Sequence, residues 1–544
     1  MGGITRRSFA KVAAMGLTAL PFGTLLTACS VSQKDDEKGK DTPNSQVIIA
    51  MNPGSEPAAG FDPLISWGCG EHVHEPLIQS TLITTDLTMN FVNDLATSYE
   101  NSPDGMEWTF TIRNDVVFSD GTPLRASDVA FTINSIINSN ASQADLSMVK
   151  EALATDETTV VFSMDKPHNA LLYTLAVIGI VPEHAYDEGY GSQPIGSGRY
   201  LVEQWDQGQQ IILVANPDYY GEPVVMKRVV VVFMEEDAAL AAVQSGQVDV
   251  AFTSPALADQ EILGYELVSC KTVDSRGISL PIVASGATKN EGDIQYSVGN
   301  DVTCDVAVRQ AINCALDRSA LAENVLNGWG TPAYSVCDAL PWASEDMFVD
   351  YDVELALNLL DSAGWKAGAD AVLEKNGIRA SFDLIYSSND STRQALAAEF
   401  SNQMKKIGIE VNPVGLGWDD IYPRQYSDPV LWGWGSNTPT ELFELNYSSG
   451  WGNYAGYAND VSDDYFDAAL AENNFEESYE LWRKAQWDGK VGPAPAGSAT
   501  WVWMVNVEHL YFMRNNLIMA AQKPHPHGHG WSLVNNIDQW RWSA

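Results

Sequence analysis

Positively charged residues are scarce in this chain of 544 residues, where 31 lysines and arginines stand against 71 aspartates and glutamates and give a formal net charge of −40. Such an acidic body repels a phosphate backbone, which excludes nucleic acid as a partner. Only six cysteines occur, and no two of them form the C-x-x-C pair of zinc and redox sites. Long apolar runs are missing too, since the run at residues 12–28 is broken by Pro21 and barely reaches across a bilayer.

Catalytic motifs are equally hard to find. The sequence contains no nucleophile elbow, no H-E-x-x-H and no phosphate loop. A secreted hydrolase with paired carboxylates, such as a glycosidase, is the alternative from another class, but Asp and Glu are too abundant for any pair to stand out. We therefore expect a protein that is not an enzyme and keep the secreted hydrolase as a remote alternative.

Residues 1–28 have the layout of an export signal, with a basic start, an apolar run and small residues before Cys29. The start TRRSFAK at 5–11 resembles the twin-arginine motif, and an ordinary Sec signal is the alternative. Residues 26–29, LTAC, resemble a bacterial lipobox, in which Cys29 carries a diacylglyceryl thioether; a buried cysteine is the alternative. Two acyl chains hold a protein at a membrane surface. We expect an exported protein anchored by lipid to the outer face of the cytoplasmic membrane.

The segment after the lipobox is polar. Residues 30–46 carry many charges and one apolar residue, so a flexible tether is predicted over 29–46. Five cysteines follow Cys29, and this odd number leaves at least one thiol free. We expect structural roles for them, and Cys304 with Cys337 is the first pair to test for a disulfide.

From Val47 onward, short β-branched runs alternate with helical periodicity, which predicts an α/β fold. The sequence predicts strands over 47–50, 108–113, 229–234, 248–252, 381–386 and 408–411, a turn over 119–123, and helices over 126–137, 238–245, 306–316, 353–362 and 391–407. Ser127 or Asp128 is the expected cap of the first helix, and Gly246 ends the second. The series from 229 to 252 is a parallel crossover unit. The simplest interpretation is two α/β lobes joined by crossing strands.

Several motifs carry a more specific resemblance. WxFxIRxxVxF from residue 108 and DGTPLxAxDVxF from residue 120 resemble the signature of the family 5 bacterial solute-binding proteins, the peptide, opine and nickel receptors of ABC importers. Arg199 stands where that family usually has proline. Further segments follow in the family's order: PIGSGRY at 194–200, NPDYY at 216–220, the helix-Gly-x-x-Asp element at 241–249, VRQAINCALDR at 308–318, GTPA at 330–333, and the segments 356–365 and 457–464.

The resemblance implies a two-lobed clamshell of the periplasmic-binding-protein type (class II, cluster C) with an extra subdomain in lobe I. Carried onto this sequence, lobe I spans 47–270, lobe II spans 271–499, and residues 500–544 return to lobe I. It also implies a monomer without a resident cofactor that closes on a ligand and presents it to ABC permease subunits. Closure is then a population shift set by the ligand's differential affinity for the closed state.

The resemblance places the ligand between the lobes, touched by a loop at 62–75 and by a tryptophan-rich segment at 431–440. Trp432 and Trp434 alternate with glycines, so an extended backbone projects both rings to one face, where they suit stacking on a ligand. Two core tryptophans are the alternative. Peptide receptors of the family tend to carry an acidic residue where this chain has Gly435 and Ser436, which weakens a plain oligopeptide interpretation unless Glu441 or Glu444 substitutes. The predicted ligand-binding residues are Trp67, Glu71, His72, Tyr386, Arg424, Trp432, Trp434, Asn437 and Thr438.

Histidines form two clusters, at 72 and 74 and at 525–529. Neutral imidazoles together with carboxylates suit nickel or zinc, so a nickel ion or metal chelate is the alternative cargo, with His525, His527 and His529 as its ligands. A structural role in capping the return strand that ends at Trp540 is the alternative for these histidines. The predicted function is capture of a peptide-like ligand, first, or a metal chelate, second.

Overall fold

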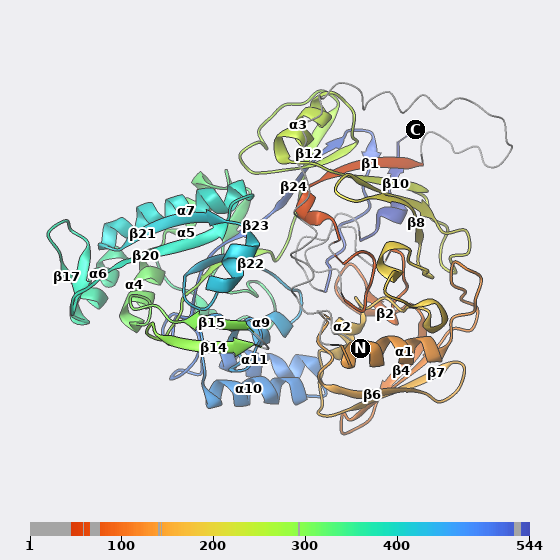
Figure 1. Ribbon diagram of the computed structural model, residues 1–544, viewed down its shortest axis with the longest axis horizontal. Coiled ribbons are helices and arrows are strands. Elements are labelled where there is room, and N and C mark those ends of the chain that lie inside the picture. Colours follow the sequence, from red (N-terminus) through yellow and green to blue (C-terminus); the bar gives the residue numbers. More distant parts are fainter. Residues whose placement is uncertain are drawn as a thin grey trace. The chain divides into compact units, whose positions relative to one another are not determined.

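The computed structural model describes residues 45–57, 59–65, 77–139, 142, 144–291, 294–526 and 535–543. The fold is mixed α/β, as the sequence predicts (Figure 1). The predicted export signal, Cys29 and the tether as far as residue 44 lie outside the described residues, and Gln46 already belongs to the first strand. Within the described part of the chain, no helix has both the length and the apolar character needed to cross a membrane.

A seven-stranded sheet forms the core of lobe I. Its central strand β1 runs parallel to a neighbour on each side, β10 and β11, and α3 (Glu236–Gln244) connects those two. Gly246 follows α3 with a φ of 71°, where glycine is favoured, so the predicted crossover unit is confirmed. In sheet order the strands are β12 (Tyr265–Cys270), β24 (His509–Arg514), β11 (Val250–Thr253), β1 (Gln46–Met51), β10 (Arg228–Phe233), β9 (Gln210–Ala215) and β8 (Tyr200–Asp206).

A four-stranded antiparallel sheet with α1 (Ala126–Ile137) beside it makes up the extra subdomain (Figure 1). Its strands are, in order, β4 (Ala96–Asn101), β5 (Glu107–Ile112), β7 (Thr159–Met164) and β6 (Val149–Ala154), and α2 (Leu171–Leu175) follows β7 in the chain. The period-2 strand is confirmed, because Trp108, Phe110 and Ile112 are buried on one face of β5. The predicted cap of α1 is wrong. Arg125 is the N-cap residue, and the carboxylate of Asp128 accepts its backbone N–H at 2.9 Å from inside the first turn.

A six-stranded mixed sheet forms the core of lobe II. Its strands are, in order, β16 (Gly330–Pro332), β23 (Trp501–Val507), β13 (Ser275–Ser279), β22 (Val430–Trp434), β20 (Ser381–Ser387) and β21 (Glu410–Leu416). The predicted helices and strands of this lobe are confirmed, and α7 lies over β20 and β21 (Figure 1).

The helices that follow in lobe II are α4 (Val306–Ala315), α5 (Arg318–Asn324), α6 (Val353–Ser362), α7 (Ser391–Met404), α8 (Trp418–Ile421), α9 (Thr440–Asn446), α10 (Asp460–Ala471) and α11 (Tyr479–Gln486). The short strands outside the three large sheets are β2 (Ile83–Thr85), β3 (Phe91–Asn93), β14 (Ala287–Glu291), β15 (Ile294–Val298), β17 (Lys366–Ala367), β18 (Leu373–Lys375), β19 (Ile378–Arg379), β25 (Leu517–Ile518) and β26 (Arg541–Trp542).

Two crossing segments join the sheets of the two lobes. The first leads from β12 to β13, and the second leads from β23 to β24. The first segment is hydrogen-bonded to the end of β23, where the second begins, because the Thr272 hydroxyl donates to the Val507 carbonyl at 2.6 Å and the Val507 N–H donates to the Asp274 carbonyl at 2.9 Å. Since β23 still belongs to the second sheet, the chain re-enters the first sheet at His509, whereas the family resemblance places this return at residue 500.

The predicted disulfide between Cys304 and Cys337 is wrong. Both cysteines are free thiols, as are Cys270 and Cys314. Cys337 is buried in the aromatic core of lobe II near Ser335, whereas Cys304 is only partly buried and its thiol contacts the Asp301 carbonyl at 3.3 Å. The two thiols therefore occupy different environments, which the count of cysteines does not reveal.

Candidate functional site

One edge of the second sheet gathers polar and aromatic groups. The carboxyl ends of β20, β21 and β22 meet at this edge, because β20 pairs in parallel with both of the others. The segments that leave them are Ser388–Asp390, Gly417–Trp418 and Gly435–Thr438. The antiparallel strand β13 begins at the same edge, because Ser275 pairs with Trp434, and this brings the first crossing segment to the site. Ligands of open α/β sheets bind at such an edge.

An aromatic cluster lies on one face of β22 at this edge. Trp432 and Trp434 project to the same face, as the alternation with glycine predicts, and their ring centroids are 6.2 Å apart. Trp432 is 4% exposed and stacks on Tyr454 at 4.4 Å and on Trp418 at 5.8 Å, while its Nε1 donates to the Ser279 hydroxyl. Trp432 is thus largely a core side chain that supports the cluster.

The outer part of the aromatic cluster is open to solvent. Trp434 is half-buried, and its Nε1 has no hydrogen-bond partner among the described residues. Trp451 is 55% exposed and packs edge-on against Trp434 at 5.4 Å, and Tyr422 is 48% exposed and stacks on Trp418 at 5.6 Å. Exposed rings on a rigid aromatic base offer a surface on which planar or apolar groups can stack.

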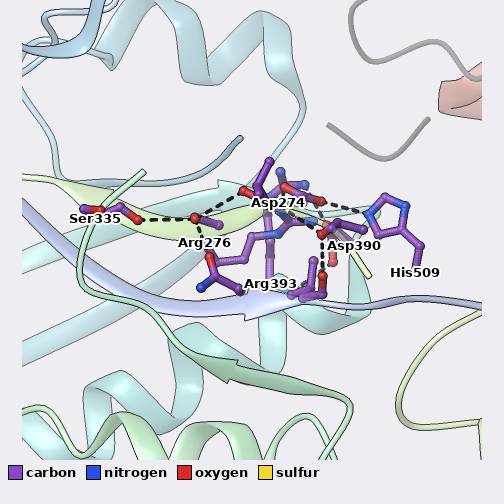
Figure 2. Close-up of polar contacts among 11 residues, drawn as sticks. Asp274, Arg276, Ser335, Asp390, Arg393 and His509 are labelled. Carbon is purple, nitrogen blue, oxygen red and sulfur yellow. Dashed lines mark hydrogen bonds and ion pairs between the residues drawn. The ribbon is translucent and has the colours of Figure 1, made fainter. Parts of the chain in front are cut away.

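A buried charge cluster occupies the opposite face of the same strand pair. It consists of Asp274, Arg276, Asp390 and Arg393, with His509 at its border (Figure 2). Arg276 forms an ion pair with Asp274, whose side chain is 2% exposed, and Arg393 forms one with Asp390 at 2.6 Å. His509 Nε2 lies 3.0 Å from Asp274 Oδ2 and so contacts it across the crossing segments.

The charges of this cluster compensate one another. Burial raises the pKa of Asp390, but the guanidinium groups of Arg393 and Arg276 outweigh it and hold that pKa below its ordinary value. Burial lowers the pKa of Arg276, and the carboxylates of Asp274 and Asp390 more than restore it. Asp390 and Arg276 thus both favour their ionised forms, and the two guanidinium groups lie against two carboxylates, which is the condition for burying such charges.

Gly433 links the aromatic cluster to the buried charge cluster. It lies between the two tryptophans and opposite Arg276 in the register of β13 and β22. A Cβ atom at this position would lie 2.5 Å from Arg393 Nη2 and 2.7 Å from Arg276 Nη1. A side chain there would require both arginine side chains to shift, and because each is held in an ion pair, we infer that the guanidinium groups set the position of the strand that carries both rings.

Two glutamates of α9 lie behind the aromatic cluster. Glu441 is buried, and burial raises its pKa well above the ordinary value, with Asp274 adding to the effect and the Gly435 N–H opposing it. Burial and Asp145 raise the pKa of Glu444 to about 8, and its carboxylate accepts the Trp451 N–H at 3.1 Å. Both glutamates, considered above as substitutes for the family's acidic residue, thus favour the protonated form.

The residues after β22 bind another part of the chain. Asn437 donates its backbone N–H to the Pro526 carbonyl at 3.1 Å and its side-chain amide to the His525 carbonyl at 2.8 Å. The Thr438 hydroxyl lies 2.8 Å from that of Ser436, which donates to the Pro526 carbonyl. The tryptophan-rich segment and the C-terminal segment are therefore neighbours, and both the backbone N–H and the side-chain amide of Asn437 donate to this contact.

Tyr386 and Arg424 are separate from the aromatic cluster. Tyr386 is buried and points to the opposite face of the sheet, packed with Leu384 in the core beneath the helices. Arg424 forms a two-pronged pair with Asp428 at 2.9 and 3.0 Å and a further contact with Asp383 at 3.3 Å. The Arg424 guanidinium therefore already binds two nearby carboxylates.

Part of the predicted site lies outside the described residues, namely Trp67, Glu71, His72, His527 and His529. His525 is described and buried. Within the described ranges, no group of three or more His, Cys, Asp or Glu side chains could hold a metal ion.

The residues that support the site were not predicted from the sequence. Trp418 comes from the segment after β21, Tyr454 from the segment after α9, and Arg393 from the start of α7. One signal was available: Asp274 and Arg276 stand two positions apart at the start of an otherwise small and apolar run, which marks charges that must be paired when buried.

The comparisons with known proteins agree with this architecture. The sequence profile of the "Bacterial extracellular solute-binding proteins, family 5 Middle" matches residues 90–490. Protein XP55 of Streptomyces lividans is 31% identical over 91% of this chain and 90% of its own, and the oligopeptide-binding protein AppA of Bacillus subtilis is 29% identical over 81% and 83%.

Solved structures share the fold. NikZ from Campylobacter jejuni, in complex with Ni(L-His), matches with a TM-score of 0.78 and 25% identity and covers 92% of this chain and 100% of its own. AppA from Bacillus subtilis, in complex with a nonapeptide, matches with a TM-score of 0.73 and covers 92% and 99% at 24% identity. The profile match spans most of the chain, and the two-lobed fold is shared. The chain therefore belongs to the family 5 bacterial extracellular solute-binding proteins.

Proposed function

We propose that this protein is the extracytoplasmic, lipid-anchored receptor of an ABC importer, which captures a peptide-like ligand between its lobes and delivers it to the membrane permease. The observation that carries the proposal is the aromatic cluster at the carboxyl edge of the second sheet, with exposed Trp451 and Tyr422 rings on a base of packed rings. The relatives named for oligopeptide binding support a peptide as the first ligand class.

A rigid aromatic surface suits a ligand of varied sequence. Stacking and apolar contact depend little on the identity of a side chain, whereas backbone amides of a peptide supply hydrogen-bonding groups at every residue. The guanidinium groups of Arg276 and Arg393 are already paired, so the described part of the site offers no excess positive charge. This favours neutral or cationic ligands over anionic ones.

A nickel ion or metal chelate is the second candidate cargo. Two observations favour it: the structural match to NikZ with its Ni(L-His) ligand, and the position of His525, whose carbonyl is bound by Asn437 next to the aromatic cluster. Imidazole nitrogens are suitable nickel ligands.

A calorimetric titration tests the peptide proposal. Pooled synthetic nonapeptides should bind the full-length chain, and Trp434→Ala should weaken binding about fivefold, since an aromatic contact contributes about 1 kcal/mol beyond its buried area. Trp205→Phe is the matched control, because Trp205 packs against Phe61 in lobe I. Chromatography of the peptides after incubation should show them intact, whereas cleavage would favour a hydrolase. Binding of Ni²⁺ that His525→Ala abolishes, without binding of peptide, would favour the second candidate.

The lipid anchor needs its own test. Mass spectrometry of the membrane fraction should show an N-terminal diacylglyceryl cysteine at Cys29, and Cys29→Ser should release the protein from membranes. Retention of the Cys29→Ser protein on membranes would contradict the anchor.

A further inference from the structure

A contact between the lobes lies away from the aromatic cluster and the two crossing segments. The extra subdomain of lobe I meets the carboxyl end of α10 in lobe II through Asn169, which precedes α2. The Asn169 backbone N–H donates to the Leu470 carbonyl at 2.9 Å, and its side-chain amide donates to the Ala469 carbonyl at 2.8 Å. Lobe I thus caps a helix of lobe II.

The cap satisfies groups that the helix itself leaves open. Ala469 and Leu470 belong to the last turn of α10, where backbone carbonyls have no partner within the helix. A second amide makes a similar bond in the other direction, because Asn473 donates to the Pro103 carbonyl of the extra subdomain at 3.0 Å. Lys166 and Asp467 add an exposed ion pair at 3.5 Å, which contributes little.

An apolar contact accompanies the cap. Ala170 and Tyr173 of the extra subdomain are buried within the aromatic core of lobe II. The Tyr173 ring packs on the Phe475 ring, with 5.4 Å between the ring centroids. Phe475 in turn packs on Trp342 at 5.6 Å. Two lobe I side chains therefore share a hydrophobic core with the opposite lobe, and moving the lobes apart would expose these surfaces to water.

We propose that Asn169, Tyr173, Asn473 and Phe475 form a latch that holds the lobes together independently of the ligand and sets the resting population of the closed state. The inference deepens the proposed function, because it concerns the regulation of that binding site. None of the four residues belongs to the aromatic cluster, so the latch stabilises the closed state equally for every ligand. The latch then scales all affinities by one factor, and the aromatic cluster determines specificity.

Hydrogen–deuterium exchange of the full-length chain without added ligand tests the latch. Asn169→Asp replaces the amide that donates to the Ala469 carbonyl by a carboxylate, at a helix carboxyl end where negative charge is unfavourable. We expect exchange to accelerate at least about fivefold in residues 166–175 and 469–475 together, the factor that one net hydrogen bond supplies. Small-angle scattering of the same sample should show a larger radius of gyration.

The matched control is a cap on the same helix that stays within lobe II. The Asn459 side chain accepts the N–H groups of Val461 and Ser462, both at 3.1 Å, at the amino end of α10. Asn459→Ala should accelerate exchange at 460–463 and leave 166–175 and the scattering radius unchanged. Two results would contradict the latch: hydrogen exchange at residues 166–175 that accelerates as much in Asn459→Ala as in Asn169→Asp, or exchange in Asn169→Asp that accelerates only at residues 469–475. Because no ligand is involved, such a result leaves the proposed function standing.

Discussion

Substituting Gly433 by alanine probes the connection between the buried charge cluster and the aromatic cluster. The backbone at Gly433 is that of an ordinary β-strand, so the loss of glycine's freedom alone would stabilise the fold by about 0.5–1 kcal/mol. Against this, the new methyl group would lie 2.5 and 2.7 Å from two guanidinium nitrogens that are buried and paired. A shift of either arginine side chain weakens its charged hydrogen bonds. We therefore take the upper part of the range of destabilisation by overpacking, about 3 kcal/mol. The net expectation is a loss of about 2 kcal/mol.

Urea unfolding followed by tryptophan fluorescence measures this loss. Gly417→Ala is the matched control, because a Cβ at Gly417 has nothing within 4 Å and its φ is −74°. The control should be neutral or slightly stabilised. A Gly433→Ala protein as stable as the wild type would refute the reasoning that the guanidinium groups fix the position of the strand.

Three further predictions concern groups outside Gly433. Because the pKa of Glu444 is raised to about 8, the folded state keeps a proton at pH values where the unfolded state has lost it, so the free energy of unfolding should fall as pH rises from 5 to 8. Glu444→Gln should flatten this dependence of the free energy of unfolding on pH. An unchanged slope in the variant would contradict the raised pKa. Intact mass without reductant should show all four described thiols reduced, with Cys304 alkylated first and Cys337 only on unfolding, whereas a mass lower by two hydrogens would indicate a disulfide. Arg318 is buried and donates to the Ala333 and Trp503 carbonyls and to the Asn313 side chain. Arg318→Leu should therefore lower the free energy of unfolding by about 3 kcal/mol, as measured by thermal or urea unfolding. A loss below about 1 kcal/mol would show that these hydrogen bonds are dispensable.

Much of the local structure follows from periodicity. The alternation of Trp108, Phe110 and Ile112 predicted β5, and the apolar spacing of 126–137 predicted the bounds of α1. The series from β10 through α3 to β11 was predictable because a parallel crossover needs a strand, a helix, a glycine and a strand in that order. In each case the information lies within about twenty residues.

The candidate site depended on contacts that local patterns do not contain. Trp432 and Trp434 were found because their alternation sets a common face, but the stacking of Trp418 and Tyr454 on Trp432 depends on how separate segments meet. Tyr386, which was predicted as a ligand-binding residue, lies on the opposite face of the sheet from the tryptophans, because the register of β20 with β22 places it there. The buried charge cluster also brings Arg276 close to Asp390 and Arg393, which lie more than one hundred positions away in the sequence.

Native mass spectrometry of the full-length chain, purified without chelator or added ligand, tests the central claim most directly. We expect a ladder of peptide adducts, one peptide per chain, that is lost after partial unfolding and returns when peptides are added back. A chain that carries no adduct and takes up no peptide, or that carries only a stoichiometric metal removed by His525→Ala, would contradict it.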